Sequence, residues 1–141
     1  MKISLHGTPD FHFEAKSPDN GYTFSIGASK AIGGDESGFR PMQVMLVALG
    51  SCSGIDVVNI LKKSRVDFDS VDIDVEGDRV PGAVPAPFTK VTMTFRVHGR
   101  GVDRAKVDKA ISLSVEKYCS AVASLDPNIK VETVTEIVEA G

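Results

Sequence analysis

The sequence predicts an α+β fold with the element order βββ-α-ββ-α-β and one long, buried central helix. Three short segments near the N-terminus alternate apolar and polar residues with period two, as strands with one solvent-facing side do. A continuous apolar pattern of helical type follows over residues 42–64. Because helices and strands do not alternate strictly along the chain, the order favours α+β over a doubly wound parallel sheet. We expect one domain over residues 1–141.

The three N-terminal strand segments cover residues 2–6, 11–16 and 22–26. Short turns separate them at residues 7–10 and 17–21, where glycine, proline and aspartate recur. Two strands that are joined by a short turn form an antiparallel pair. The sequence therefore predicts an antiparallel meander with one face toward solvent.

The central helix is expected to begin at Pro41, because proline lacks a backbone N–H and the first helical turn does not need one. The basic residues Lys62, Lys63 and Arg65 suit its end. Residues 44–49 are all apolar and cover every side of the helix, which predicts burial all round. A domain of this length rarely surrounds a long helix alone, so we expect a homodimer in which a second subunit completes the burial. The alternative is a monomer whose sheet and second helix cover it.

Strands are also expected over residues 71–76 and 91–97, where apolar and polar residues again alternate. The connection over residues 81–87 contains three prolines and cannot be regular structure. Residues 129–138 are rich in strand-forming residues and predict a last strand.

A second helix is expected to begin near Asp103, which is a good N-cap residue, and to close before Pro127. Apolar residues at helical spacing give it one apolar face. They are Val107, Ala110, Ile111, Val115, Tyr118 and Val122.

Charge and hydropathy exclude several classes of partner. The formal net charge is −3 at pH 7, which argues against a nucleic-acid partner. Residues 44–61 are the only candidate membrane span, and Asp56 near the middle would cost roughly 2.5–3.5 kcal/mol there. We therefore expect a buried helix and no membrane partner. The N-terminus lacks an apolar segment behind a basic start, so we expect a cytoplasmic protein without a secretory signal.

Histidine and cysteine spacing predicts no metal site and no bound cofactor. His6, His12 and His98 are scattered over the polar faces of strands, where they are expected at the surface. The two cysteines form no CxxC pair and are too few for a disulfide-stapled secreted domain. In a reducing compartment, they are either two packing residues or one redox pair.

The two cysteines, Cys52 and Cys119, suit a redox pair because each lies on the apolar side of a predicted helix. Small residues flank Cys52, and Cys119 follows Val115 by four positions. A thiolate attacks the O–O bond of a hydroperoxide and becomes a sulfenic acid, and a second thiol condenses with it to a disulfide. An external dithiol then restores both thiols. Apolar surroundings favour organic or lipid hydroperoxides. The alternative role is packing, which is common for buried free cysteine.

Residues 40–52, RPMQVMLVALGSC, resemble the first-cysteine helix of the OsmC/Ohr family of osmotically inducible and organic hydroperoxide resistance proteins. Residues 54–58 and 116–120 resemble the OsmC-like branch in particular. The resemblance implies an OsmC-like fold, an intertwined homodimer and reduction of hydroperoxides. It also implies a peroxidatic role for Cys52 and a resolving role for Cys119, with a lipoyl-type dithiol as the reductant.

The resemblance also implies an arginine that stabilises the thiolate and a glutamate, early in the first helix, that holds this arginine. Gln43 stands near the position of that glutamate, and no arginine precedes Arg40. Arg40 and Gln43 are therefore candidate supporting residues, together with Glu116 beside Cys119. Arg40 also fits a surface role where the loop meets the helix.

The departures from the family pattern leave a second functional hypothesis open. In this alternative, the chain is a non-enzymatic dimeric protein that binds a small hydrophobic ligand in the dimer cleft or senses redox state. Asp56, one turn after Cys52, would oppose thiolate formation if it faced the same side, and otherwise it caps or pairs elsewhere.

Overall fold

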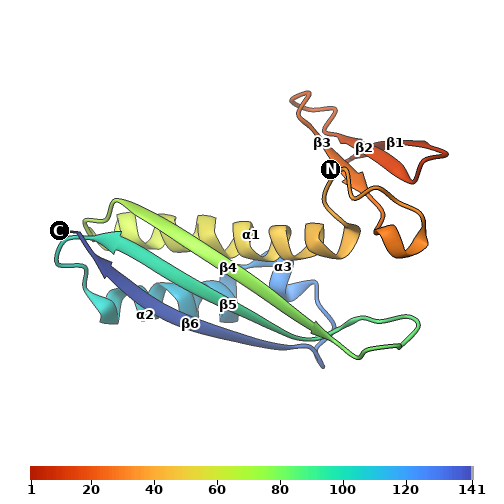
Figure 1. Cartoon of the computed structure of the whole chain (residues 1–141). Helices are drawn as coiled ribbons and strands as arrows, with labels where there is room; N and C mark the ends of the chain where they lie inside the picture. The colour runs from red at the N-terminus through yellow and green to blue at the C-terminus, as the bar shows by residue number, and fades with distance from the viewer. Residues whose placement is uncertain (141) are drawn as a thin grey trace. The chain divides into compact units, whose positions relative to one another are not determined.

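The computed structural model describes residues 1–140, and the chain forms two compact units, Met1–Met45 and Leu46–Gly141. Figure 1 shows the elements of both. The mixed α+β class and the predicted element order are confirmed. The single domain over residues 1–141 stays a prediction, and each unit is described by itself.

The first unit contains an antiparallel meander of three strands: β1 (Ser4–Thr8), β2 (His12–Lys16) and β3 (Thr23–Gly27). This is the arrangement that the alternating segments predict. A short 3-10 helix, η1 (Lys30–Ile32), follows the last of these strands.

One face of this first sheet is apolar and largely uncovered. Leu5 pairs with Ala15, and Ala15 pairs with Phe24, so these three side chains share a face. Ala15 is buried, whereas Leu5 and Phe24 are 60 % and 45 % exposed. The face therefore leaves large apolar side chains in solvent in the single chain.

Helix α1 (Pro41–Lys63) begins and ends within about one residue of its predicted bounds. Pro41 occupies the first helical position. The side-chain oxygen of Gln43 accepts a hydrogen bond from the backbone N–H of Arg40 at 2.9 Å, which satisfies a donor at the helix start. Lys62 and Lys63 lie in the last turn, where they complement the helix dipole.

The second unit is built on a sheet in the order β4 (Ser70–Arg79), β5 (Phe88–Gly99) and β6 (Lys130–Glu139). The central strand β5 is antiparallel to β4 and parallel to β6. In Figure 1, α1 and α2 (Arg104–Leu113) lie on the same face of this sheet. Alternate residues of β5 point into this core and are fully buried: Val91, Met93, Phe95 and Val97.

Helix α1 packs on the sheet through a face that carries two glycines. A Cβ at Gly50 would lie 2.6 Å from a methyl group of Val75, and one at Gly54 would lie 2.7 Å from the terminal methyl of Ile73. The close approach is therefore by side chains of β4.

Within the single chain, α1 is buried mainly on one face, and the burial on every side that its sequence predicts with a second subunit stays a prediction. Val47 and Ile55 of this helix are 50 % and 71 % exposed. By length and composition alone, α1 is long and apolar enough to cross a membrane. Core helices of soluble proteins meet the same criterion. The absence of a membrane partner stays a prediction.

The second predicted helix is interrupted, so the prediction of one continuous helix was wrong. Asp103 caps α2 as predicted, accepting hydrogen bonds from the N–H groups of Ala105 and Lys106. After α2, the chain makes a π-helical turn, η2 (Ser114–Tyr118), and then a separate short helix, α3 (Ser120–Ala123).

The interruption has a local cause. Cys119 adopts an extended backbone (φ −73°, ψ 103°) and serves as the N-cap of α3. As a result the predicted apolar face is only partly buried. Val107 and Ala110 are fully buried, whereas Tyr118 is half exposed.

Candidate active site

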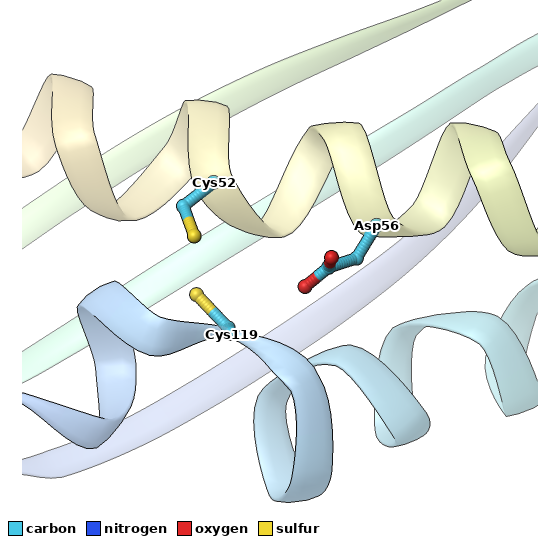
Figure 2. Close-up of side chains that lie close together, drawn as sticks. All are labelled: Cys52, Asp56 and Cys119. Atoms are coloured by element: carbon cyan, nitrogen blue, oxygen red, sulfur yellow. The ribbon is translucent and has the colours of Figure 1, made fainter.

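The structure brings Cys52 and Cys119 together from separate helical segments. Figure 2 shows their sulfur atoms pointing toward one another, with the carboxylate of Asp56 beside them. The two sulfurs and a carboxylate oxygen of Asp56 all lie within 4.8 Å of one another. Both thiols are free. This cluster of Cys52, Asp56 and Cys119 is called the thiol–carboxylate cluster below.

Cys52 and Asp56 project from the same side of α1 because they lie one helical turn apart. Both residues are half-buried. The neighbouring Ser53 and Gly54 are buried and hold this turn of α1 against the rest of the second unit.

Cys119 is held by its backbone and is only 3 % exposed. Its N–H donates to the carbonyl of Ser114 at 2.7 Å, which closes the π-helical turn. Its sulfur accepts from the N–H of Val122 at 3.5 Å. Burial raises the pKa of the Cys119 thiol, while the hydrogen bonds from Val122 and from Ser53 act in the opposite direction. Cys119 therefore remains a thiol to higher pH than a free cysteine.

A buried hydrogen-bond network supports the cluster. The hydroxyls of Ser53 and Ser114 are 2.9 Å apart, and both residues are fully buried. The Ser114 hydroxyl also lies 2.9 Å from Oδ2 of Asp56. An ionised carboxylate only accepts, so Ser114 donates to Asp56. Ser114 thus fixes the orientation of this carboxylate.

Asp56 therefore faces the thiols. The spacing of Cys52 and Asp56 already allowed this arrangement, because i and i+4 share a helix face. Ser53 and Ser114 were not identified as candidates. Nothing local marks Ser114, since its partners lie on a helix remote in sequence.

The other three candidate residues lie outside this cluster's hydrogen bonds. Arg40 and Gln43 belong to the first unit, where Gln43 caps α1 and the Arg40 guanidinium pairs with Glu36 at 3.9 Å. Glu116 is an exposed residue of the π-helical turn. Their supporting roles stay predictions.

Together these features define a class of protein: an α+β thiol protein in which a half-buried cysteine faces a buried one. The family model described as OsmC-like protein matches residues 33–134. The chain therefore belongs to the OsmC-like protein family, as its first-cysteine helix predicts.

The chain resembles both curated and solved relatives. Protein YhfA of Escherichia coli (strain K12) is 39 % identical over 100 residues, which cover 71 % of this chain and 74 % of that protein. A hypothetical protein from Aquifex aeolicus VF5 has a TM-score of 0.84 at 28 % identity, over 99 % of this chain and 97 % of the other. The organic hydroperoxide resistance protein OhrB of Bacillus subtilis has a TM-score of 0.67 at 19 % identity, over 96 % of each chain. At that identity OhrB shows the shared fold alone.

Proposed function

We propose that this chain is a cysteine-based peroxidase that reduces organic or lipid hydroperoxides with an external dithiol. The observation that carries the proposal is the meeting of two free sulfurs from separate segments of the chain, one on a half-buried residue and one on a buried residue. Structural relatives named as organic hydroperoxide resistance proteins, from Bacillus subtilis and Legionella pneumophila, support it.

The reaction balances over the two sulfurs. The Cys52 thiolate attacks one oxygen of ROOH, the O–O bond breaks, and the leaving alkoxide takes a proton to become ROH. Cys52 is then a sulfenic acid, oxidised by two electrons. Cys119 attacks that sulfur, an S–S bond forms, and hydroxide leaves as water after protonation. A dithiol reduces the disulfide by exchange and is itself oxidised to a disulfide.

Burial supports the division of roles. Cys52 is half-buried and can meet a substrate, whereas Cys119 is almost fully covered. Because burial raises the pKa of Cys119, this residue keeps its proton while Cys52 reacts. The N–H of Val122 then stabilises the Cys119 thiolate at the moment it attacks.

We further propose that the chain acts as a homodimer in the cytoplasm. The uncovered side of α1, with Val47 and Ile55, is suited to burial against a second copy. A reducing cytoplasm keeps both thiols free between turnovers.

The test is peroxide consumption by the fully reduced protein, with cumene hydroperoxide as substrate and dihydrolipoamide as reductant. We expect sustained consumption, and loss of it in Cys52→Ser. Cys119→Ser should consume one equivalent and stop as a sulfenic acid that dimedone traps. Ser112→Ala, an exposed change on α2, is the control. Equal rates in Cys52→Ser and the wild type would contradict the proposal.

Asp56 favours the second candidate function, a redox-sensing or ligand-binding protein without turnover. A carboxylate within 4.8 Å of both sulfurs opposes formation of the reactive thiolate. Such a protein would form the Cys52–Cys119 disulfide once per oxidant exposure and would not cycle with dihydrolipoamide. Native mass spectrometry of the freshly purified dimer would show a hydrophobic ligand if the cleft binds one.

A further inference from the structure

We propose that the thiol–carboxylate cluster is a Zn²⁺ site, with Cys52, Cys119 and Asp56 as its three protein ligands. No peroxide chemistry is needed for this role, so it stands apart from the proposed peroxidase. The cluster contains two sulfurs and one carboxylate oxygen within 4.8 Å of one another, and the three side chains point into the space between α1 and the Cys119 segment (Figure 2).

The spacing of the donors fits a tetrahedral ion after a small contraction. Zinc lies about 2.3 Å from thiolate sulfur and about 2.0–2.2 Å from carboxylate oxygen, so two sulfurs and one oxygen in a tetrahedral site are about 3.5–3.8 Å apart. In this protein the three donor atoms lie within 4.8 Å of one another. Side-chain torsions alone can close a difference of this size. Three protein ligands leave the fourth position for water.

The carboxylate has the support that metal ligands usually have. The Ser114 hydroxyl, on a fully buried residue, holds Oδ2 of Asp56 at 2.9 Å, and the Ser53 hydroxyl in turn lies 2.9 Å from that of Ser114. Outer partners of this kind orient a ligand before the ion arrives. Asp56 also faces the two thiols, which is the direction that a shared metal ion requires.

Charge and ligand chemistry select the metal. Two thiolates and one carboxylate carry three negative charges within one cluster. A divalent ion leaves a net charge of only −1 on this half-buried cluster and replaces the two thiol protons. Thiolate sulfur favours zinc over magnesium or calcium, which prefer oxygen.

Histidine and cysteine spacing predicted no metal site, because the three histidines are scattered and the two cysteines are distant in sequence. The fold adds Asp56 as a third donor on the same helix face as Cys52. Bound zinc would hold both sulfurs as metal-bound thiolates, so the two cysteines could not form a disulfide while the ion is bound.

The experiment is titration of the reduced protein with Zn²⁺ against a competing chelator, and with Co²⁺ as a spectroscopic probe. We expect one ion per chain, release of about two protons, and a thiolate-to-cobalt charge-transfer absorption. Cys52→Ser and Cys119→Ala should each remove stoichiometric binding. Asp56→Asn should weaken Zn²⁺ binding at least tenfold, and Ser114→Ala by roughly 10–100-fold through loss of ligand orientation. Asp108→Asn, on the exposed side of α2, is the matched control.

Failure of binding by the wild type, or equal affinity in wild type and Asp56→Asn, would overturn the three-ligand site. Metal-free unfolding midpoints identify any variant that has lost its fold. If a variant has lost its fold, a second measurement on the wild type replaces it: bound Zn²⁺ should protect Cys52 from an alkylating reagent. Equal alkylation with and without Zn²⁺ would also overturn the proposal. None of these readouts uses peroxide, so the two proposals can fail separately. A protein that binds zinc but consumes no peroxide would contradict only the peroxidase, and a protein that consumes peroxide but binds no zinc would contradict only the zinc site.

Discussion

At the scale of single residues, the cluster depends on how differently its two cysteines are placed. Cys52 is a half-buried residue within a regular helix, whereas Cys119 is 3 % exposed and caps a short helix through its own sulfur. Asp56 adds a negative charge and Ser114 fixes its direction. The two cysteines of the cluster therefore differ in burial and in backbone environment.

Cys119 should ionise only above the ordinary value of 9.0, because burial raises the pKa of its thiol. A raised pKa contributes stability that is fully present below the unfolded value and is lost as pH rises through the folded value. Thiolate absorption of Cys52→Ser, in which Cys119 is the one remaining cysteine, should rise at higher pH in the folded than in the urea-unfolded protein. A folded-state midpoint at or below the unfolded one would contradict the assignment.

At the scale of elements, close contact between α1 and the sheet fixes the position of the cluster. Gly50 and Gly54 allow the helix to approach β4, and the core residues of β5 fill the space beneath. At the edge of the same sheet, Glu132 of β6 pairs with Lys90 of β5 at 2.8 Å and with Lys130 at 2.9 Å. These contacts hold the parallel strand pair in register.

Gly50→Ala should destabilise the protein although alanine is the better helix former. The added Cβ would lie 2.6 Å from a methyl group of Val75, a stiff β-branched side chain. Overpacking of this kind costs about 1–3 kcal/mol, and the helix propensity gain offsets about 1 kcal/mol. Gly54→Ala is the matched comparison, because it meets the mobile end of Ile73. Urea unfolding should rank Gly50→Ala as the less stable of the two, and the reverse order would refute the packing argument.

Glu132→Gln should alter the acid sensitivity of the fold. The two lysine partners lower the pKa of Glu132 from 4.5 to about 2, so its contribution is present above pH 4.5 and is lost as pH falls toward 2. The thermal midpoint of the variant should lie below that of the wild type at neutral pH and converge with it near pH 2. Glu14→Gln, at an exposed site on β2, is the control. A constant difference across the whole pH range would exclude the ion pairs as its cause.

At the scale of the whole molecule, apolar surface is left uncovered in a single chain. The outer side of α1 exposes Val47 and Ile55, and one face of the first sheet exposes Leu5 and Phe24. Apolar surface on this scale in an otherwise soluble composition indicates an interface. We therefore expect the functional molecule to contain more than one chain.

Ile55→Glu should dissociate the proposed homodimer, because it places a charge on the side of α1 that a second copy would cover. Ile55 is 71 % exposed in the single chain, so the change should leave the monomer fold intact. Light scattering after size exclusion should give twice 15.0 kDa for the wild type and 15.0 kDa for the variant. Val84→Glu, at a 96 % exposed loop position, is the control and should remain dimeric. A wild-type mass of 15.0 kDa would refute the homodimer.

The sequence by itself determined the parts of this protein that depend on local pattern. Period-two alternation located the first five strands, and strand-forming composition located the last one. The apolar run from Pro41 located α1, and residues 40–52 identified the family. Each of these signals lies within a short stretch of chain, where hydrophobic periodicity and capping are decisive.

Only the tertiary structure decided how the cluster is composed. The extended backbone at Cys119 interrupts a segment whose periodicity is helical throughout, and its N–H and sulfur bond locally to Ser114 and Val122. The link from Ser114 to Asp56 joins residues remote in sequence. Such long-range hydrogen bonds leave no periodic trace, so the third donor beside the two thiols was visible only once α1 and the Cys119 segment were packed together.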